Sequence, residues 1–296
     1  VYRSMSAIRG GAVAITGLSL LGLSLLGVFG LELFCETTLR LPRRQAPLDP
    51  NWETVRIEAR DGAMLEGSWI QTNTSSHRCV LMVPGIGASR ADMHWFVPPF
   101  YRHNYKILIT DDRAQGTSGG SLVTYGLLEK FDAIDWAHWM QRQGCSSVYG
   151  LGESMGASIL IQAAEVEPVF RSIAAECAFS DLRPSAEAVF RELVPLPAWL
   201  AKPVSRGAVG IALQYARLRY GVDLRQVSPI RSIAHTQTPV LLIHGTKDRK
   251  TPYWHSQALA QAGPKASLWL VPEAGHVSAH GTQPEEFERR VLQFFD

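Results

Sequence analysis

The segment GESMG at residues 152–156 constrains the fold of this chain more than any other. It follows the pattern G-x-S-x-G, in which a serine occupies a sharp turn between a strand and a helix. The flanks agree, because residues 147–151 are typical of a short buried strand and residues 157–164 of a helix. Glycines are expected at both ends of the turn, where a Cβ would clash with the backbone. The pattern predicts that the hydroxyl of Ser154 is presented at a strand end.

The same glycines also allow a second interpretation, a dinucleotide-binding turn. Gly150, Gly152 and Gly156 come close to a dinucleotide fingerprint. Glu176 follows at the distance expected of a ribose-binding acid. Glu153, however, would lie in the phosphate-binding turn, where its carboxylate would repel a pyrophosphate, and the turn comes late in the chain. We therefore favour the serine interpretation.

A serine hydroxyl becomes a nucleophile when a base lies within hydrogen-bond reach and an acid orients that base. Asp248 follows the predicted strand at residues 240–244, and His276 follows the predicted strand at residues 267–271. Functional residues of open α/β sheets lie just beyond strand ends. The order Ser, acid, His is also one in which such triads occur. The sequence therefore predicts Ser154 as nucleophile, Asp248 as orienting acid and His276 as base.

Other residues compete for these roles. The predicted acid could be a turn-forming aspartate and the predicted base a loop histidine without a chemical role. His280, further from the strand end, is the second candidate for the base, and His244 is expected to pack at its strand end. Asp181 and Asp223 are weaker candidates for the acid, because neither directly follows a clear strand.

Acyl transfer also needs backbone N–H donors for the oxyanion that develops on the substrate. The residue after the nucleophile, Met155, would supply one donor. Residues 79–83 are a strongly β-forming apolar run, and the glycine-bearing segment 84–87 follows it. We expect the second donor there, at the Ile86 amide, with the Gly87 amide as the alternative. A plain glycine-rich turn is the other interpretation of this segment.

From about Trp52 to Asp296 the chain resembles the α/β-hydrolase superfamily. Residues 111–120 are similar to the family's D-x-R-G-x-G-x-S-x-G loop, and residues 124–132 to the T-x-G-x-x-E-x-x-D opening of the next helix. Residues 240–276 are similar to the acid and base segments. Within the family the chain resembles bacterial serine hydrolases with a short helical cap, the esterase and serine aminopeptidase-like branch.

The chain departs from the family pattern at two places. Ala114 and Gln115 replace a usual Gly and His, and Pro84-Gly85 replaces the common His-Gly before the oxyanion loop. Neither change removes a predicted triad residue. Both affect the expected oxyanion geometry and substrate preference.

The apolar pattern predicts an α/β fold. Residues 52–71 are typical of an antiparallel hairpin that turns at Asp61-Gly62. Strands then alternate with helices, which is typical of a mostly parallel sheet with helices on both faces. The predicted strands cover residues 79–83, 106–110, 147–151, 172–176, 240–244 and 267–271, and further helices cover residues 127–143 and 284–295.

Residues 179–232 are too long for a simple crossover and are predicted to form a helical cap over the active site. The apolar character of this insertion suggests a lipophilic acyl or alcohol group in the substrate. The other interpretation is that its apolar residues only pack on the core.

The N-terminal part of the chain contains an uncharged run of 22 residues, 10–31, which is long enough to cross a bilayer. We predict a transmembrane anchor or signal segment at residues 1–34, a linker at residues 35–51 and the catalytic domain at residues 52–296. The expected location is a single-pass position in a bacterial inner membrane, or the periplasm or exterior if a signal is cleaved. Arginines on both sides of the run leave the orientation open.

Composition excludes several classes of protein. The chain has 29 basic and 27 acidic residues, so nothing favours nucleic acid as a partner. It shows no P-loop, metal-ligand cluster or repeat, so no cofactor and no metal are predicted. The four cysteines are scattered, with Cys79 in a predicted strand and Cys177 just after one, so a disulfide framework is not expected. The sequence does not set the oligomeric state.

Together these features predict a membrane-anchored serine hydrolase that cleaves carboxylic esters through an acyl-enzyme intermediate. An amidase or peptidase is the first alternative, because the same three residues serve both reactions. A non-catalytic hydrolase-like membrane protein is the second, suggested by the departures at residues 84–85 and 114–115. The expected partner is a small-molecule ester or amide.

Overall fold

The computed structural model describes residues 30–296, apart from residues 31, 34, 46, 73 and 74. Its centre is an eight-stranded sheet with the strand order β1-β2-β4-β3-β5-β6-β7-β8. The strands are β1 (Glu53–Glu58), β2 (Met64–Ile70), β3 (Arg78–Val83), β4 (Lys106–Thr110), β5 (Ser147–Glu153), β6 (Ile173–Glu176), β7 (Val240–Gly245) and β8 (Ala266–Val271). Pairing is antiparallel from β1 through β2 to β4 and parallel across the rest of the sheet. The predicted α/β class with a mostly parallel sheet is confirmed.

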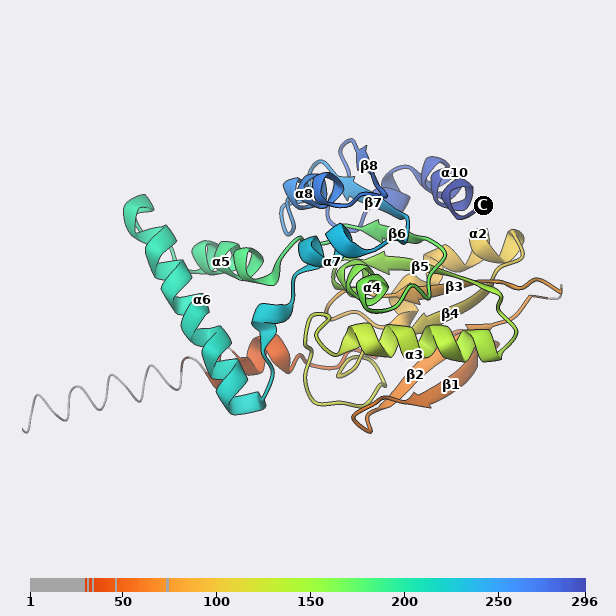
Figure 1. Ribbon diagram of the computed structural model, residues 1–296, viewed down its shortest axis with the longest axis horizontal. Coiled ribbons are helices and arrows are strands. Elements are labelled where there is room, and N and C mark those ends of the chain that lie inside the picture. Colours follow the sequence, from red (N-terminus) through yellow and green to blue (C-terminus); the bar gives the residue numbers. More distant parts are fainter. Residues whose placement is uncertain (1–29, 31, 34, 46, 73–74) are drawn as a thin grey trace, which may run out of the picture.

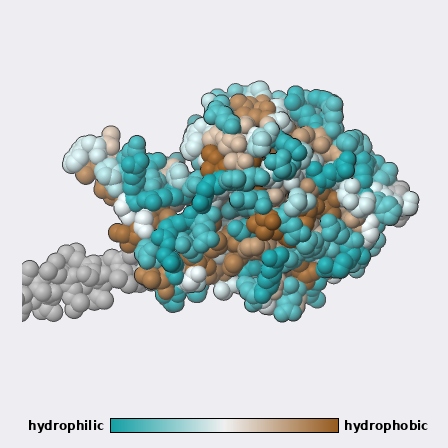
Figure 2. Space-filling view, viewed as in Figure 1, coloured by the Kyte–Doolittle hydropathy of each residue, from teal (hydrophilic) through white to brown (hydrophobic). Residues whose placement is uncertain are grey.

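Helices cover both faces of the sheet (Figure 1). One face packs against α3 (Glu129–Arg142), α4 (Met155–Val166), α7 (Pro229–His235) and α8 (Trp254–Ala262). The other face packs against η1 (Arg90–Phe96), α2 (Val97–Arg102), α9 (Ala279–Thr282) and α10 (Pro284–Phe295). Each face therefore has its own hydrophobic core, and hydrophilic residues cover much of the visible surface (Figure 2).

The central strand β3 shows why the sequence forms this sheet. Its apolar run is continuous because successive side chains point to opposite faces and both faces are covered. Cys79 and Leu81 are buried in the core beneath α3 and α4, whereas Val80 and Met82 are buried in the core beneath α2 and α10. β3 is thus buried along its length. Its carboxyl end leads directly into the glycine-bearing segment 84–87.

The two loop motifs behind the family resemblance hold the beginning of α3. Arg113 donates to both carboxylate oxygens of Asp132, each at 2.7 Å. The Glu129 carboxylate accepts from the backbone N–H groups of Thr124 and Gly126, at 2.6 and 2.7 Å. Because these carboxylates and the guanidinium are buried, each is matched by a charge or by backbone donors. The loops are thereby fixed beside the end of β4.

The insertion between β6 and β7 contains α5 (Leu182–Leu193), α6 (Ala198–Tyr220) and η2 (Leu224–Gln226) ahead of α7. α5 and α6 form a helical hairpin that extends away from the sheet (Figure 1). Its inner side chains pack in a third apolar cluster, separate from the two cores of the sheet, which includes Leu182, Val209 and Leu213. We refer to this hairpin as the cap.

The N-terminal stretch of the described chain belongs to the cap rather than to a linker. Residues 35–39 are helical, and Cys35 and Leu39, one helical turn apart, are buried in the third cluster. The carbonyl of Leu39 accepts from the Val123 N–H at 2.7 Å, and the Tyr125 hydroxyl donates to the Thr38 carbonyl at 2.9 Å. The prediction of a linker at residues 35–51 missed this helix because its apolar face is only two side chains wide.

The uncharged run at residues 10–31 lies outside the described residues, apart from Gly30. Among the residues that the structure describes, no helix is both long enough and apolar enough to cross a bilayer. The predicted anchor or signal segment therefore stays a prediction.

The structure corrects one expectation about the cysteines. Cys79 at the beginning of β3 and Cys145 before β5 form a disulfide, with their Cα atoms 5.8 Å apart. The two strands are neighbours in the sheet, so residues far apart in the sequence meet at the same end. Cys35 and Cys177 are free and buried. The prediction that no disulfide forms was wrong because scatter along the sequence says nothing about which strands are adjacent.

Candidate active site

Ser154 lies in a strained turn between β5 and α4. Its backbone has φ 52° and ψ −108°, a region that residues with a Cβ rarely occupy. The glycines on either side are needed, since a Cβ on Gly152 would lie 2.6 Å from the Ala157 nitrogen and one on Gly156 would collide with the Val83 carbonyl. The Ser154 N–H donates to the Glu176 carbonyl at 2.7 Å and ties the turn to β6.

The structure brings the three predicted side chains into one hydrogen-bonded chain. His276 Nε2 lies 3.0 Å from Ser154 Oγ, and His276 Nδ1 lies 2.7 Å from Asp248 Oδ2. Because a carboxylate only accepts, Nδ1 carries the proton in this pair and Nε2 of the neutral ring is free to accept from the hydroxyl. Each residue follows the end of a different parallel strand, namely β5, β7 and β8.

Asp248 is held in its charged form. Its side chain is buried, and its Oδ1 accepts from the backbone N–H groups of Lys250 and Thr251, each at 2.9 Å. Burial alone would raise the pKa of Asp248, but hydrogen bonds from His244 and His276 outweigh it and hold the pKa well below its usual range. A carboxylate anion therefore faces the imidazole across the neutral pH range.

His244 is the site residue that sequence reasoning missed. Its Nε2 lies 2.6 Å from the Thr251 carbonyl and 3.2 Å from Asp248 Oδ2. Its Nδ1 lies 2.7 Å from Ser256 Oγ. The ring does pack at the end of β7, as expected, but its Nε2–H, which donates to the Thr251 carbonyl, also lies beside the carboxylate oxygen that accepts from His276. A histidine at a strand end, shortly before the acid, was the available signal.

The other candidates for acid and base bond elsewhere. His280 packs its ring against Phe96 and Phe287. Asp181 caps the beginning of α5, where it accepts from the Arg183 N–H at 3.1 Å, and Asp223 pairs with Arg225. None of the three is bonded to Ser154.

The dinucleotide interpretation does not fit the structure. Glu176, the proposed ribose ligand, is buried and accepts from the Ala279 N–H at 2.8 Å. Its carboxylate therefore supports the loop that carries His276 instead of facing a ligand. Burial raises the pKa of Glu176 to about 7, and the charge of Asp248 adds to the effect. Burial and the charge of Glu176 also raise the pKa of Glu153.

Because the pKa of Glu176 is raised, we expect the free energy of unfolding to depend on pH. A buried carboxyl whose pKa rises from 4.5 to about 7 on folding favours the folded state below pH 4.5, and this contribution is lost as the pH rises to about 7. The loss amounts to about 3 kcal/mol of unfolding free energy. Glu176→Gln, which keeps the acceptor for Ala279, should flatten this decline. Urea unfolding at about pH 5 and about pH 8 measures it; an equal decline in both proteins would contradict the assignment.

The two predicted oxyanion donors lie beside Ser154. Met155 is the first residue of α4, so its N–H has no partner within the helix. The segment after β3 lies against Ser154, because a Cβ on Gly85 would be 3.4 Å from Ser154 Cβ. The Gly87 N–H is occupied by Gln115 Oε1, which accepts from it. This contact leaves the Ile86 amide as the better of the two candidates in that segment.

Gln115 and Ala114 explain the departures from the family pattern. Gln115 is buried and reaches from the loop after β4 to the segment after β3, so it fixes the candidate oxyanion loop. Ala114 has φ 59°, which is the conformation that the usual glycine adopts without strain. Ala114 thus adopts a backbone conformation that glycine favours, and Gln115 uses its side chain to bond the Gly87 N–H.

Cys177, Asp248 and His276 form a cluster of potential metal ligands that the sequence analysis did not find. One donor atom from each lies within 4.8 Å of the others. Burial raises the pKa of the Cys177 thiol, so Sγ remains protonated, and it accepts from the Val277 N–H at 3.4 Å. A metal here would need the atoms through which Asp248 and His276 contact each other and Ser154. The cluster arises from topology, not from sequence spacing.

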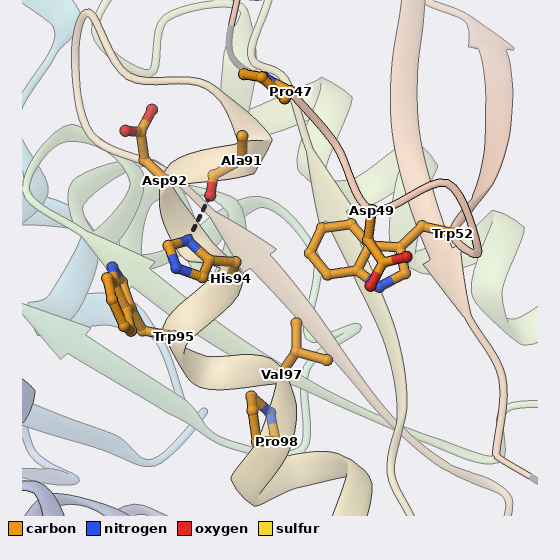
Figure 3. Close-up of a pocket in the computed structure, with 9 residues that line it drawn as sticks. All are labelled: Pro47, Asp49, Trp52, Ala91, Asp92, His94, Trp95, Val97 and Pro98. Carbon is orange, nitrogen blue, oxygen red and sulfur yellow. Dashed lines mark hydrogen bonds between the residues drawn. The ribbon is translucent and has the colours of Figure 1, made fainter.

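A cavity of about 530 Å³ lies beside η1 and the chain before β1 (Figure 3). It is lined by Pro47, Asp49, Trp52, Ala91, Asp92, His94, Trp95, Val97 and Pro98. The carboxylates at its rim are already engaged, since Asp92 accepts from the Ser89 N–H at 2.8 Å and Asp49 from the Asn51 N–H at 2.9 Å. No residue of the hydrogen-bonded chain lines this cavity.

The fold, the strained serine turn and the strand-end residues together define a member of the alpha/beta hydrolase family. The chain belongs to this family, whose model matches residues 80–290. That the site works without a cofactor or a metal stays a prediction.

Individual relatives are more distant. The chain is similar to the uncharacterized protein YqkD of Bacillus subtilis, with 28% identity over 200 residues, 65% of this chain and 62% of YqkD. A shorter stretch of 91 residues is 36% identical to the pimeloyl-(acyl-carrier protein) methyl ester esterase of Nitrosomonas europaea, covering 30% of this chain and 34% of that protein. The chain thus spans less than two thirds of the length of either relative.

A solved structure shows the same fold. The Pyrococcus furiosus esterase Pf2001 superposes with a TM-score of 0.68 at 22% identity, covering 86% of this chain and 96% of that chain.

Proposed function

We propose that the protein is a serine hydrolase that cleaves carboxylic esters. The observation that carries the proposal is the hydrogen-bonded chain from Ser154 through His276 to Asp248, with the serine in a strained turn between strand and helix. Strain is retained in folded proteins where the surrounding structure enforces it, and such residues cluster at active sites. The esterase names of one relative and one structural neighbour support an ester substrate.

The proposed reaction has two halves. Ser154 Oγ attacks the ester carbonyl while His276 Nε2 takes its proton, and the resulting imidazolium is stabilised by Asp248. The N–H groups of Met155 and Ile86 bind the oxyanion. The imidazolium then protonates the leaving alcohol, which leaves an acyl group on Ser154. A water molecule, deprotonated by the same ring, attacks the acyl carbonyl and restores the free serine.

The substrate and the cellular location are also proposals. The apolar composition of the insertion at residues 179–232 is the basis for proposing a lipophilic acyl or alcohol group, although its buried side chains pack on one another. The uncharged run at residues 10–31 favours a single-pass anchor in a bacterial inner membrane, with a cleaved export signal as the alternative.

A panel of dissolved esters and aminoacyl amides tests the proposed reaction. Purified full-length protein should turn over short and medium p-nitrophenyl esters well above the rate of aminoacyl p-nitroanilides. Faster turnover of the amides would assign the protein to the amidase or peptidase class. Failure to turn over either group would favour the non-catalytic alternative.

His244 should act as a positioning residue in this reaction. His244→Ala removes a polar N–H that lies 3.2 Å from Asp248 Oδ2 and should lower kcat roughly tenfold, since a polar contact to a charged group contributes about 1.5–3 kcal/mol. His244→Gln keeps an N–H donor and should restore part of the loss. We expect the acidic limb of the pH–kcat profile to shift upward in His244→Ala. A lower melting temperature with unchanged kcat and profile would show that the ring only packs.

A further inference from the structure

The outer face of α6 carries exposed apolar side chains. Val204, Ile211 and Leu218 expose 38%, 59% and 76% of their surface. They are spaced by seven residues, two helical turns, so they form a stripe along one side of the helix. The opposite side carries the residues that pack inward: Ser205, Val209, Ala212, Leu213 and Ala216. α6 is thus apolar on two sides, and only one of them is covered within the chain.

The charges of α6 are of one sign. The helix, whose residues are all described, has four basic side chains and no acidic one; the four are Lys202, Arg206, Arg217 and Arg219. The arginines make only long contacts to partly covered carboxylates, at 4.0 Å to Glu187, 3.9 Å to Asp223 and 3.6 Å to Glu32. Each of the three arginine side chains is more than half exposed. Their charges are therefore available to an anionic surface.

The same hairpin meets the beginning of the described chain. The Tyr220 hydroxyl, at the end of α6, lies 3.1 Å from carboxylate oxygens of both Glu32 and Glu36. Leu33, between these two acids, is exposed. The uncharged run at residues 10–31 ends immediately before them. In Figure 1 the hairpin extends from the body on the side where the chain enters, and Figure 2 shows hydrophobic residues on this lobe.

We propose that the outer face of α6 docks on the surface of an anionic phospholipid bilayer. An exposed apolar stripe with cations on its flanks, here Arg217 and Arg219, is a pattern of helices that lie in a membrane interface. The long arms of arginine and lysine reach headgroup phosphates while their stems cover apolar surface. A second copy of the chain is the alternative occupant, but the uncharged run that ends immediately before Glu32, beside Tyr220, favours a bilayer.

A fluorophore on the stripe tests the contact in the full-length protein. Ile211→Cys, labelled with a polarity-sensitive thiol-reactive dye, is reconstituted in vesicles of equal parts phosphatidylcholine and phosphatidylglycerol with brominated acyl chains. The native free cysteines are buried. Leu218→Cys repeats the measurement on the same stripe, and Gln141→Cys on the exposed surface of α3 is the matched control.

We expect a blue shift and at least about twofold stronger quenching at positions 211 and 218 than at position 141, because interfacial helices bury their apolar face among the acyl chains. Quenching should weaken in pure phosphatidylcholine. Equal quenching at all three positions would overturn the proposal. A blue shift without lipid that is lost on dilution would assign the stripe to contact between two copies, and equal quenching in pure phosphatidylcholine would overturn the role of the basic residues.

Discussion

Replacing Ser154 by Ala should lower kcat/KM for p-nitrophenyl esters by roughly 10⁴- to 10⁶-fold. The variant lacks Ser154 Oγ, which lies 3.0 Å from His276 Nε2, so no acyl-enzyme can form. The fold should be unaffected, because Ala and Ser have similar steric limits at φ 52°. Steady-state kinetics at equal protein concentration, with melting temperatures alongside, measure the effect.

Ser158→Ala is the matched control, one helical turn further along α4. Ser158 Oγ accepts from the Phe179 N–H at 3.1 Å and is not bonded to His276. Its loss should lower stability by about 1–3 kcal/mol, because a buried N–H is left without a partner, while turnover stays within a few fold of wild type. Activity of Ser154→Ala within a few fold of wild type would rule out the proposed mechanism.

Asp248→Asn should have the second largest effect, a loss of roughly 10³- to 10⁴-fold in kcat. His276 donates to Asp248 Oδ2, His244 Nε2 lies 3.2 Å from the same oxygen, and two backbone N–H groups donate to Oδ1. An amide cannot accept all of these bonds, because one of its two positions carries hydrogens. The amide would hold His276 in the wrong tautomer, with the proton on Nε2. The imidazolium that forms during the reaction would also lose the neighbouring negative charge. The pH–kcat profile of the variant measures the change.

Asp181→Asn supplies the comparison for this variant. The sequence analysis gave Asp181 as a weaker candidate for the acid. In the structure it lies on the loop after β6 and caps α5. We expect the exchange to change stability little, because asparagine caps a helix as well as aspartate does, and to leave kcat within a few fold of wild type. If Asp181→Asn lost activity as severely as Asp248→Asn, the assignment of the acid would be wrong.

The elements of the sheet could be predicted because their signals are local. β3 has an apolar residue at nearly every position, as a central strand covered on both faces must. The serine turn could be predicted from Gly152 and Gly156, since a Cβ at either position meets backbone atoms. The positions of Asp248 and His276 followed from the ends of β7 and β8, because parallel strands end at one edge of the sheet.

The remaining features depend on which segments become neighbours. β4 inserts between β2 and β3, so the strand order does not follow the chain. Cys79 and Cys145 meet only because β3 and β5 are adjacent. The approach of His244 to Asp248 and the packing of Cys35 in the third cluster also depend on tertiary contacts. Spacing within the sequence carries no information about such pairs.

The most direct test of the account is covalent labelling with a fluorophosphonate probe, followed by peptide mapping. The full-length protein should react rapidly and take up one probe per chain, on the tryptic peptide that contains Ser154. Labelling should disappear in Ser154→Ala and slow strongly in Asp248→Asn, because the probe requires an activated serine. An unlabelled wild-type protein, or equal labelling of Ser154→Ala, would contradict the claim that Ser154 is the nucleophile of a serine hydrolase.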